Sequence, residues 1–149
     1  MVKPTVLYLD DESPLLDIFS QMFSDEYDVR TASTLAEARQ LLKSCTPAII
    51  ISDWSMPEVS GLDFLREAAE ACPDSFRIIL TGYGQVGDAI GEISAGLVEL
   101  FITKPWTEDE LRKALERARE VIARRSGFRP GTGNTVLLMA LSHTLLNVI

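Results

Sequence analysis

Short apolar runs and stretches with helical spacing alternate along residues 1–125. The apolar runs are rich in Val, Ile, Leu and Phe and are bounded by turn residues, which is typical of buried strands. Between them, apolar residues recur every three or four positions, as on one face of a helix. The predicted strands cover residues 6–9, 27–32, 48–52, 77–81 and 100–103, and the predicted helices cover about 13–24, 34–42, 61–71, 86–95 and 107–125.

This alternation predicts an α/β fold in which a doubly wound, five-stranded parallel sheet is covered by helices on both faces. Several helix starts carry local signals as well. Ser13 offers a capping hydroxyl, and Pro14 follows at the first helical position. Thr-x-x-Glu sequences that begin at Thr34 and Thr107 predict capping boxes.

The composition changes after Arg125. Residues 126–134 contain Gly and Pro and predict a linker, and residues 135–149 are mostly apolar and predict a helical tail. We therefore expect a domain over 1–125, a linker over 126–134 and a C-terminal apolar extension over 135–149. A helix that is apolar nearly all round is normally buried, so the tail is expected to pack on a second copy or on the domain itself. Light scattering of the full chain and of a version ending at Arg125 distinguishes these two arrangements.

Composition narrows the classes of function. The formal net charge of −8 and the pI near 4.6 argue against direct binding of nucleic acid, which needs a basic surface. Cys45 and Cys72 have no histidine nearby and form no CxxC motif, which favours free thiols over a metal site or a disulfide. No apolar stretch reaches the roughly 18 residues of a membrane span. We expect a soluble, cytoplasmic protein.

Acidic residues lie at the ends of two predicted strands. Asp10 and Asp11 follow the strand at 6–9, and Asp53 follows the run at 48–52. The carboxyl ends of parallel strands share one edge of the sheet, where ligands of open α/β folds bind. Carboxylates brought together repel each other unless a cation neutralises them, and an all-oxygen cluster suits Mg²⁺. The sequence therefore predicts a Mg²⁺ site at this edge.

Two more polar residues are expected at the same edge. Thr81 ends the fourth predicted strand, and Lys104 follows the fifth. A hydroxyl and an ammonium beside an acidic metal site can bind or neutralise the oxygens of a phosphoryl group. A carboxylate in such a site can itself be the nucleophile and form an aspartyl phosphate.

Taken together and in this order, the motifs resemble those of two-component response-regulator receiver domains. The resemblance covers about residues 4–125 and implies a flavodoxin-like (βα)5 fold, as in chemotaxis regulators. It is carried by four segments, each at the end of its own predicted strand: Leu9-Asp10-Asp11-Glu12, Ser52-Asp53-Trp54-Ser55-Met56-Pro57 with Gly61, Leu80-Thr81-Gly82 and Thr103-Lys104-Pro105.

The resemblance implies a role for each residue near the acids. Asp53 is the expected phosphoacceptor, with Mg²⁺ as the cofactor. Asp11, Asp53 and the backbone carbonyl of Ser55 are the expected metal ligands, and Asp10 is expected to hold a coordinated water. Lys104 is expected to pair with the phosphoryl group and with Asp53.

The resemblance also implies a conformational switch. Thr81 is expected to move its hydroxyl toward the phosphoryl group, and Phe101 is the expected switch aromatic. The position of Phe101 within a strand fits a plain core residue equally well. The family implies self-catalysed phosphotransfer and slow autodephosphorylation, which is signalling chemistry and not metabolic catalysis.

The expected function is phosphorelay signal transduction, with a histidine kinase or a phosphotransfer protein as the phosphoryl donor. The surface formed by the fourth helix, fifth strand and fifth helix is expected to change shape and, like the apolar tail, is a candidate homodimer surface. Two alternatives stay open. A Mg²⁺-dependent phosphohydrolase with an aspartyl nucleophile usually has a second acid two residues further on, where this chain has Ser55. A receiver fragment of a longer regulator could also act as a dimerisation module.

Overall fold

The computed structural model describes residues 3–57 and 59–126. The apolar tail and nearly all of the predicted linker lie outside these residues and stay predictions. The described chain repeats a strand and a helix five times, with one short 3-10 turn, η1, before the fourth helix. The elements are β1 (Thr5–Leu9), α1 (Ser13–Phe23), β2 (Asp28–Ala32), α2 (Leu35–Cys45), β3 (Ile49–Asp53), α3 (Gly61–Ala71), β4 (Phe76–Thr81), η1 (Tyr83–Gln85), α4 (Val86–Ser94), β5 (Leu100–Thr103) and α5 (Glu108–Ser126).

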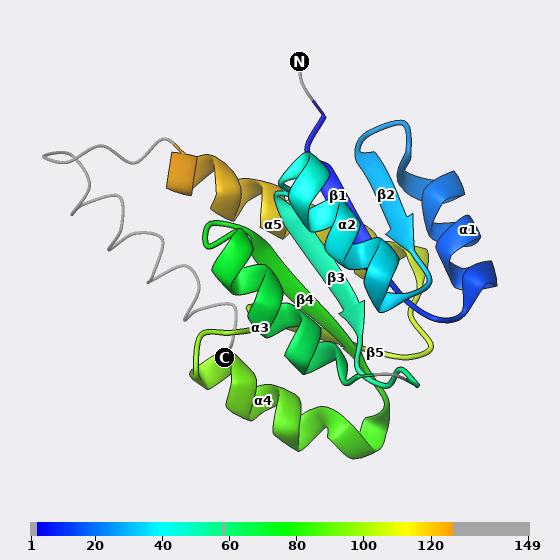
Figure 1. The fold of residues 1–149 in the computed structure, drawn as a ribbon, viewed down its shortest axis with the longest axis vertical. Helices are drawn as coiled ribbons and strands as arrows, with labels where there is room; N and C mark the ends of the chain where they lie inside the picture. The colour runs from blue at the N-terminus through cyan, green and yellow to red at the C-terminus, as the bar shows by residue number, and fades with distance from the viewer. Residues whose placement is uncertain (1–2, 58, 127–149) are drawn as a thin grey trace, which may run out of the picture.

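The five strands form one parallel sheet in the order β2-β1-β3-β4-β5 (Figure 1). This is the strand order of flavodoxin-like doubly wound folds, so the predicted fold class is confirmed. β3 lies at the centre, and each of its five residues is buried. A parallel sheet covered on both faces requires such continuous apolar runs, which is why the strands were visible in the sequence.

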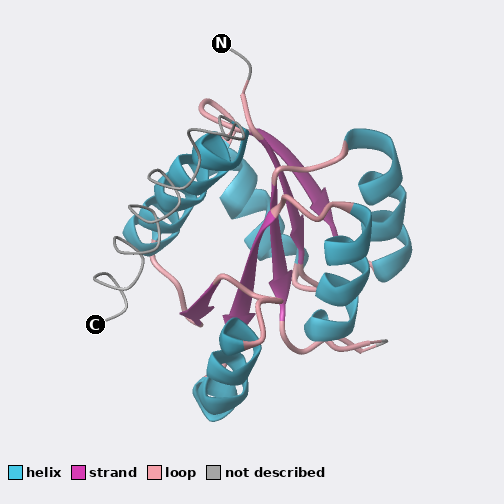
Figure 2. Ribbon diagram, turned by 90° about the vertical axis from the view of Figure 1, so that its left-hand side faces the viewer, coloured by secondary structure: helices cyan, strands magenta, loops and turns pink. Residues whose placement is uncertain are grey.

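Helices α1 and α5 cover one face of the sheet, and α2, α3 and α4 cover the other (Figure 2). An apolar core lies on each face of the sheet, and successive side chains along a strand alternate between these two cores. In β3, Ile49 and Ile51 pack with residues of α1 and α5, whereas Ile50 packs with residues of α2 and α3. Among the described helices, none combines the length and the apolar character needed to cross a bilayer.

A row of aromatic rings joins β1 to α1 and the turn that follows it. The ring of Tyr8 lies 5.0 Å from that of Phe19, Phe19 lies 4.9 Å from Phe23, and Phe23 lies 6.3 Å from Tyr27, measured between centroids. The tilted and edge-to-face arrangements are the favourable ones for aromatic pairs. All four side chains are buried, so Tyr8 is held rigidly beneath the carboxyl end of β1.

Two of the predicted helix caps are confirmed. The hydroxyl of Thr34 accepts a hydrogen bond from the backbone N of Glu37 at 3.2 Å, and that of Thr107 accepts one from the backbone N of Glu110 at 3.1 Å. In both cases the glutamate carboxylate accepts a hydrogen bond from the threonine hydroxyl in return. These bonds satisfy donors that the first turn of a helix leaves open.

The predicted capping role of Ser13 is wrong. The helix α1 already begins at Ser13, so the residue at the cap position is Glu12, whose side chain makes no capping bond. The Glu12 carboxylate instead forms an ion pair with Lys104, at 3.0 Å. Pro14 does lie in the first turn, where its missing N–H costs nothing.

The amino end of β4 contains a buried cation. The guanidinium of Arg77 donates to the carbonyl of Leu97 at 2.7 Å and to the carbonyl and hydroxyl of Ser75 at 3.1 and 3.0 Å. The backbone N of Arg77 donates to the carboxylate of Glu99 at 3.1 Å. Burial lowers the pKa of Arg77. Through these bonds, Arg77 fixes the segment between α4 and β5 to the sheet.

At the opposite edge, Gly61 lets α3 begin directly against the end of β3. Its backbone N donates to the carbonyl of Trp54 at 2.8 Å. A Cβ on Gly61 would lie 2.0 Å from the backbone oxygen of Asp53 and 2.9 Å from the hydroxyl oxygen of Ser52. Only glycine therefore allows this approach of helix to strand.

Replacing Gly61 by alanine is expected to lower the free energy of unfolding by about 1–3 kcal/mol, because the new methyl group must push α3 away from β3. Gly91→Ala in α4 is the matched control, since a Cβ there meets no atom within 4 Å. The control should raise the free energy of unfolding by about 0.5–1 kcal/mol through its helix propensity. Urea denaturation measures both changes, and equal stability of Gly61→Ala and wild type would contradict the predicted clash.

Candidate functional site

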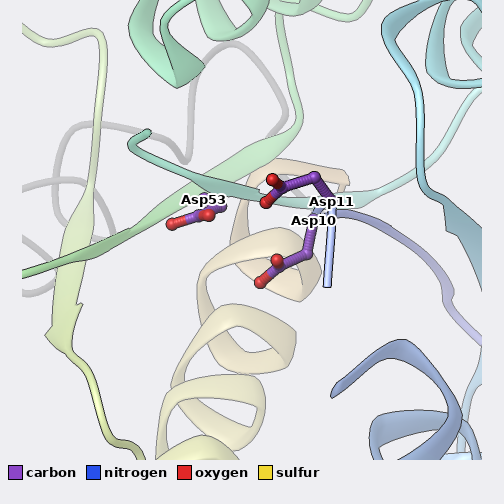
Figure 3. A group of neighbouring side chains, drawn as sticks. All are labelled: Asp10, Asp11 and Asp53. Carbon is purple, nitrogen blue, oxygen red and sulfur yellow. The ribbon is translucent and has the colours of Figure 1, made fainter. Parts of the chain in front are cut away.

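Three carboxylates gather at the carboxyl edge of the sheet. Asp10 and Asp11 follow β1, and Asp53 is the last residue of β3. Each offers a carboxylate oxygen, and these oxygens all lie within 4.8 Å of one another. In Figure 3, the side chains of Asp10 and Asp11 extend from consecutive residues toward Asp53. The structure thus brings together the acids that the sequence placed at this edge.

The strand register explains why these acids meet. β1 and β3 are neighbours, and Leu9 is paired with Ser52, so the residues that follow this pair emerge side by side. Asp10 is fully buried, Asp53 is also buried, and Asp11 is exposed. A cation could therefore reach the cluster from the side of Asp11 while binding carboxylates that are largely shielded from water.

Lys104 contributes an ammonium group to the same edge. Its Nζ atom lies 3.0 Å from a carboxylate oxygen of Glu12, 3.1 Å from one of Asp10 and 3.4 Å from one of Asp53. Burial alone would lower the pKa of Lys104, but the hydrogen bonds to Glu12 and Asp10 and the charges around it outweigh this effect and raise it. Lys104 therefore stays charged, and in this arrangement it lies closer to Glu12 and Asp10 than to Asp53. The peptide bond from Lys104 to Pro105 is cis.

The environment of Asp53 disfavours its ionised form. Burial and the negative charge of Asp10 raise the pKa of Asp53 to about 6, although the nearby Lys104 acts in the opposite direction. A single ammonium does not fully compensate a carboxylate that is buried beside other acids. A divalent cation would supply the missing positive charge.

Asp10 is held in place by two hydrogen bonds that the sequence analysis did not foresee. The hydroxyl of Tyr8 donates to Asp10 Oδ2 at 2.7 Å, and the backbone N of Glu12 donates to Oδ1 at 3.0 Å. Burial and the charge of Asp10 raise the pKa of Tyr8, so the phenol keeps its proton. The period of two along a strand puts Tyr8 and Asp10 on the same face, and this signal could have identified the pair.

Thr81 ends β4, the strand next to β3, and Phe101 lies one strand further away, on β5. The hydroxyl of Thr81 is buried and has no hydrogen-bond partner among the described residues. A buried hydroxyl without a partner is costly, and it gains stability from any acceptor that comes within reach. Phe101 pairs with Ile79 across β4 and β5 and is partly buried against the core on the α3 and α4 side. This position fits a core residue as well as the predicted switch aromatic.

Ser55 lies on the loop after Asp53, and its hydroxyl faces the neighbouring loop. The amide nitrogen of Gln85 donates to Ser55 Oγ at 3.1 Å. Between Asp53 and Ser55, the backbone N of Trp54 donates to the carbonyl of Leu80 at 2.9 Å, which extends the pairing of β3 with β4. Trp54 itself is partly buried and packs against the core on the α3 side. Gln85 was missed in the sequence because no motif or spacing marks it.

The chemistry available at this edge follows from its donor set. Three carboxylates and no nitrogen or sulfur ligand form an all-oxygen cluster, which fits a hard cation such as Mg²⁺. An ammonium lies on the same edge, and close by lies the buried Thr81 hydroxyl, which has no partner within the described part of the chain. These groups can neutralise or bind the oxygens of a small, highly charged anion such as a phosphoryl group.

Removing the charge of Asp53 is expected to stabilise the metal-free protein at neutral pH. The ordinary pKa of 3.8 applies in the unfolded chain and about 6 in the folded protein, so the folded state binds the proton more tightly. Wild-type stability should therefore fall as the pH rises from about 4 to about 6, and stay lower above that. The free energy of unfolding of Asp53→Asn should exceed that of wild type by about 1–3 kcal/mol at pH 7 and by much less at pH 4. Urea denaturation in chelator at four pH values measures this gap, and a gap independent of pH would contradict the prediction.

Comparison with known proteins gives a consistent result. A sequence model of the response regulator receiver domain matches residues 6–116. The hydrogenase transcriptional regulatory protein HoxA of Cupriavidus necator is 34% identical over 118 residues, which are 79% of this chain and 24% of that protein. The transcriptional regulatory protein GlrR of Escherichia coli is 34% identical over 120 residues, 79% of this chain and 27% of that protein. The chain thus spans about a quarter of the length of these curated relatives.

Solved structures point the same way. A response regulator receiver domain protein from Clostridium thermocellum superposes with a TM-score of 0.74 at 32% identity, over 83% of this chain and 97% of that chain. The signal receiver domain of an HD domain-containing protein from Pseudomonas fluorescens gives a TM-score of 0.75 at 27% identity, over 86% of this chain and 96% of that chain. Family match, fold and motif order agree, and the chain belongs to the response regulator receiver domain family.

Proposed function

We propose that the chain acts in phosphorelay signalling by accepting a phosphoryl group on Asp53. The observation that carries the proposal is the position of this carboxylate. It offers an oxygen within 4.8 Å of oxygens of Asp10 and Asp11, which fit a cation, and it lies 3.4 Å from the ammonium of Lys104. A nucleophile close to both a cation site and an ammonium suits phosphoryl transfer, in which charge spreads over the transferred oxygens.

The chemical step needs little beyond positioning. A carboxylate oxygen of Asp53 forms a P–O bond as the P–N bond to a donor histidine breaks, and the released imidazole takes up a proton. Mg²⁺ bound by Asp11, Asp53 and the carbonyl of Ser55 would supply positive charge to the phosphoryl oxygens. Asp10, held by Tyr8, would orient a water of that metal ion.

Lys104 and Thr81 would then respond to the new charge. A phosphoryl group adds about −1.5 to −2 charge at neutral pH. Lys104 is shared among three carboxylates before transfer and can shift toward the phosphoryl group with a short movement of its side chain. The Thr81 hydroxyl has no partner to give up among the described residues, so a new bond to a phosphoryl oxygen is a net gain. Phe101 would repack as Thr81 moves.

We propose a histidine kinase or phosphotransfer protein as the donor and a groove beside the site as its docking surface. The groove has a volume of about 520 Å³ and lies between α1 and the segment after β5. Ile18 in its wall is 42% exposed and is one of two large apolar side chains that are exposed among the described residues. An amphipathic helix could bury this side chain while its histidine reaches Asp53. The lining residues are Glu12, Leu15, Ile18, Lys104, Pro105 and Trp106.

The competing function, an aspartyl phosphohydrolase, is less well supported. Such an enzyme needs a general acid for the leaving group close to its nucleophile. Two residues after Asp53, this chain has Ser55, whose hydroxyl accepts a hydrogen bond from Gln85. We therefore propose slow loss of the phosphoryl group and no turnover of phosphomonoesters, which a phosphate-release assay checks.

Incubation with acetyl phosphate and Mg²⁺ should add one phosphoryl group to the wild-type protein, seen as a single step in intact mass. Asp53→Asn should add none, because an amide cannot act as the nucleophile. Asp17→Asn, which changes an exposed acid on α1, is the matched control and should be labelled like wild type. Equal labelling of Asp53→Asn and wild type would show that another residue is the acceptor.

Loss of Asp11 should weaken Mg²⁺ binding more than loss of Asp10. The oxygens of Asp10 already accept hydrogen bonds from Tyr8 and from the backbone of Glu12, whereas Asp11 is exposed at the mouth of the cluster. A direct ligand contributes its charge at contact distance, and one acting through water is screened. Trp54 fluorescence titrations of Asp11→Ala and Asp10→Ala measure the difference, and equal affinities would contradict these two roles.

A further inference from the structure

One side chain joins the loop after Asp53 to the loop after Thr81. The Gln85 amide nitrogen Nε2 donates to Ser55 Oγ at 3.1 Å, and its Oε1 atom accepts from the backbone N of Gly82 at 3.1 Å. Ser55 lies two residues after Asp53, and Gly82 directly follows Thr81. We call this pair of hydrogen bonds the Gln85 latch.

The Gln85 side chain is placed for this contact and not for supporting its own helix. Gln85 occupies the cap position of α4, yet its side chain makes no capping bond. The equivalent side chains of α2 and α3, Thr34 and Ser60, each cap their own helix. At α4 the side chain instead makes one bond within its own loop, to Gly82, and one to the loop after Asp53, to Ser55.

The latch is weak enough to open during signalling. Both hydrogen bonds are exposed to solvent, so water replaces them at little cost when they break. The helix that follows is also lightly held, because Ala89 is its only buried residue and Ile90 is 52% exposed. Segments with few buried apolar contacts are those that move at low cost.

We propose that the Gln85 latch is a gate on Asp53 phosphorylation, which rests on the proposed function above. The buried Thr81 hydroxyl has no partner among the described residues, and a shift of the peptide between Thr81 and Gly82 would bring it toward a phosphoryl group on Asp53. The N–H of this peptide donates to Gln85 at one end of the latch. At the other end of the latch, Gln85 donates to Ser55 in the loop after Asp53. The latch therefore favours the resting position of Thr81 and slows phosphorylation. Gln85 is a positioning residue, since it acts through Thr81 and Ser55.

The rate of labelling by acetyl phosphate with Mg²⁺, followed by intact mass, tests the gate. Gln85→Ala is expected to label about two- to tenfold faster than wild type, the range that the net free energy of one ordinary hydrogen bond gives, because water replaces much of both exposed bonds. Gln40→Ala, an exposed glutamine on α2, is the matched control and should keep the wild-type rate. Ser55→Ala should accelerate labelling less than Gln85→Ala, because the bond from Gly82 to Gln85 remains.

The double variant supplies the decisive comparison. Ser55→Ala in the Gln85→Ala background should add nothing, because the two side chains act through one contact. Wild-type or slower labelling of Gln85→Ala overturns the gate while the phosphoacceptor role of Asp53 stands. No labelling of wild type overturns the proposed function and the gate with it. Because Ser55→Ala tests the same contact independently, a poorly folded Gln85→Ala variant does not remove the test.

Nuclear magnetic resonance of the unphosphorylated protein tests the latch without any phosphoryl transfer. Ser55→Ala should shift the side-chain amide resonances of Gln85 and the backbone amide resonance of Gly82, although Gly82 lies 27 residues away in sequence. In the Gln85→Ala background the same change should leave Gly82 unmoved. If the single change Ser55→Ala leaves the Gly82 amide resonance where it is in wild type, the latch is overturned, whatever the labelling rates are.

Discussion

The mutual repulsion of carboxylates at one edge of a parallel sheet is the constraint on which the site depends. The register of β1 and β3 puts Asp10 and Asp53 side by side, and both are buried. Water cannot screen them there, so their charge must be met by neighbouring groups. Tyr8 donates to one acid, Lys104 lies near both, and Asp53 still has a pKa of about 6. This shortage of positive charge makes the edge receptive to a cation.

The parts of the site that the sequence could predict are those tied to the ends of buried strands. A continuous apolar run predicts such a strand. The positions of Asp10, Asp53 and Lys104 at one edge therefore followed from local patterns and from the rules of parallel sheets. Contacts between loops follow no such period. The bond from Gln85 to Ser55 joins residues 30 positions apart and depends on how two turns are folded. Likewise, the Glu12 side chain makes no capping bond and pairs with a residue far away in sequence, Lys104.

The contacts of Asp53 and the loop after it differ greatly between the α3 side and the α4 side. Toward α3, the backbone oxygen of Asp53 lies so close to Gly61 that no side chain fits between them. Toward α4, the contact consists of two exposed hydrogen bonds from one glutamine. Closely packed interiors resist displacement, whereas exposed polar contacts exchange with water. A change of shape that starts at Asp53 is therefore directed to the α4 side.

The buried Arg77 determines what kind of motion α4 can make. Its guanidinium holds the carbonyl of Leu97, three residues past the end of α4, from a position inside the sheet. Breaking this bond would leave a buried cation without one of its acceptors, which is far more costly than opening the contacts of Gln85 in solvent. One end of the helix is thus anchored and the other is releasable. On the proposed opening of the Gln85 latch, α4 would pivot about its carboxyl end, and a small displacement at the acid edge would move the exposed face that carries Ile90.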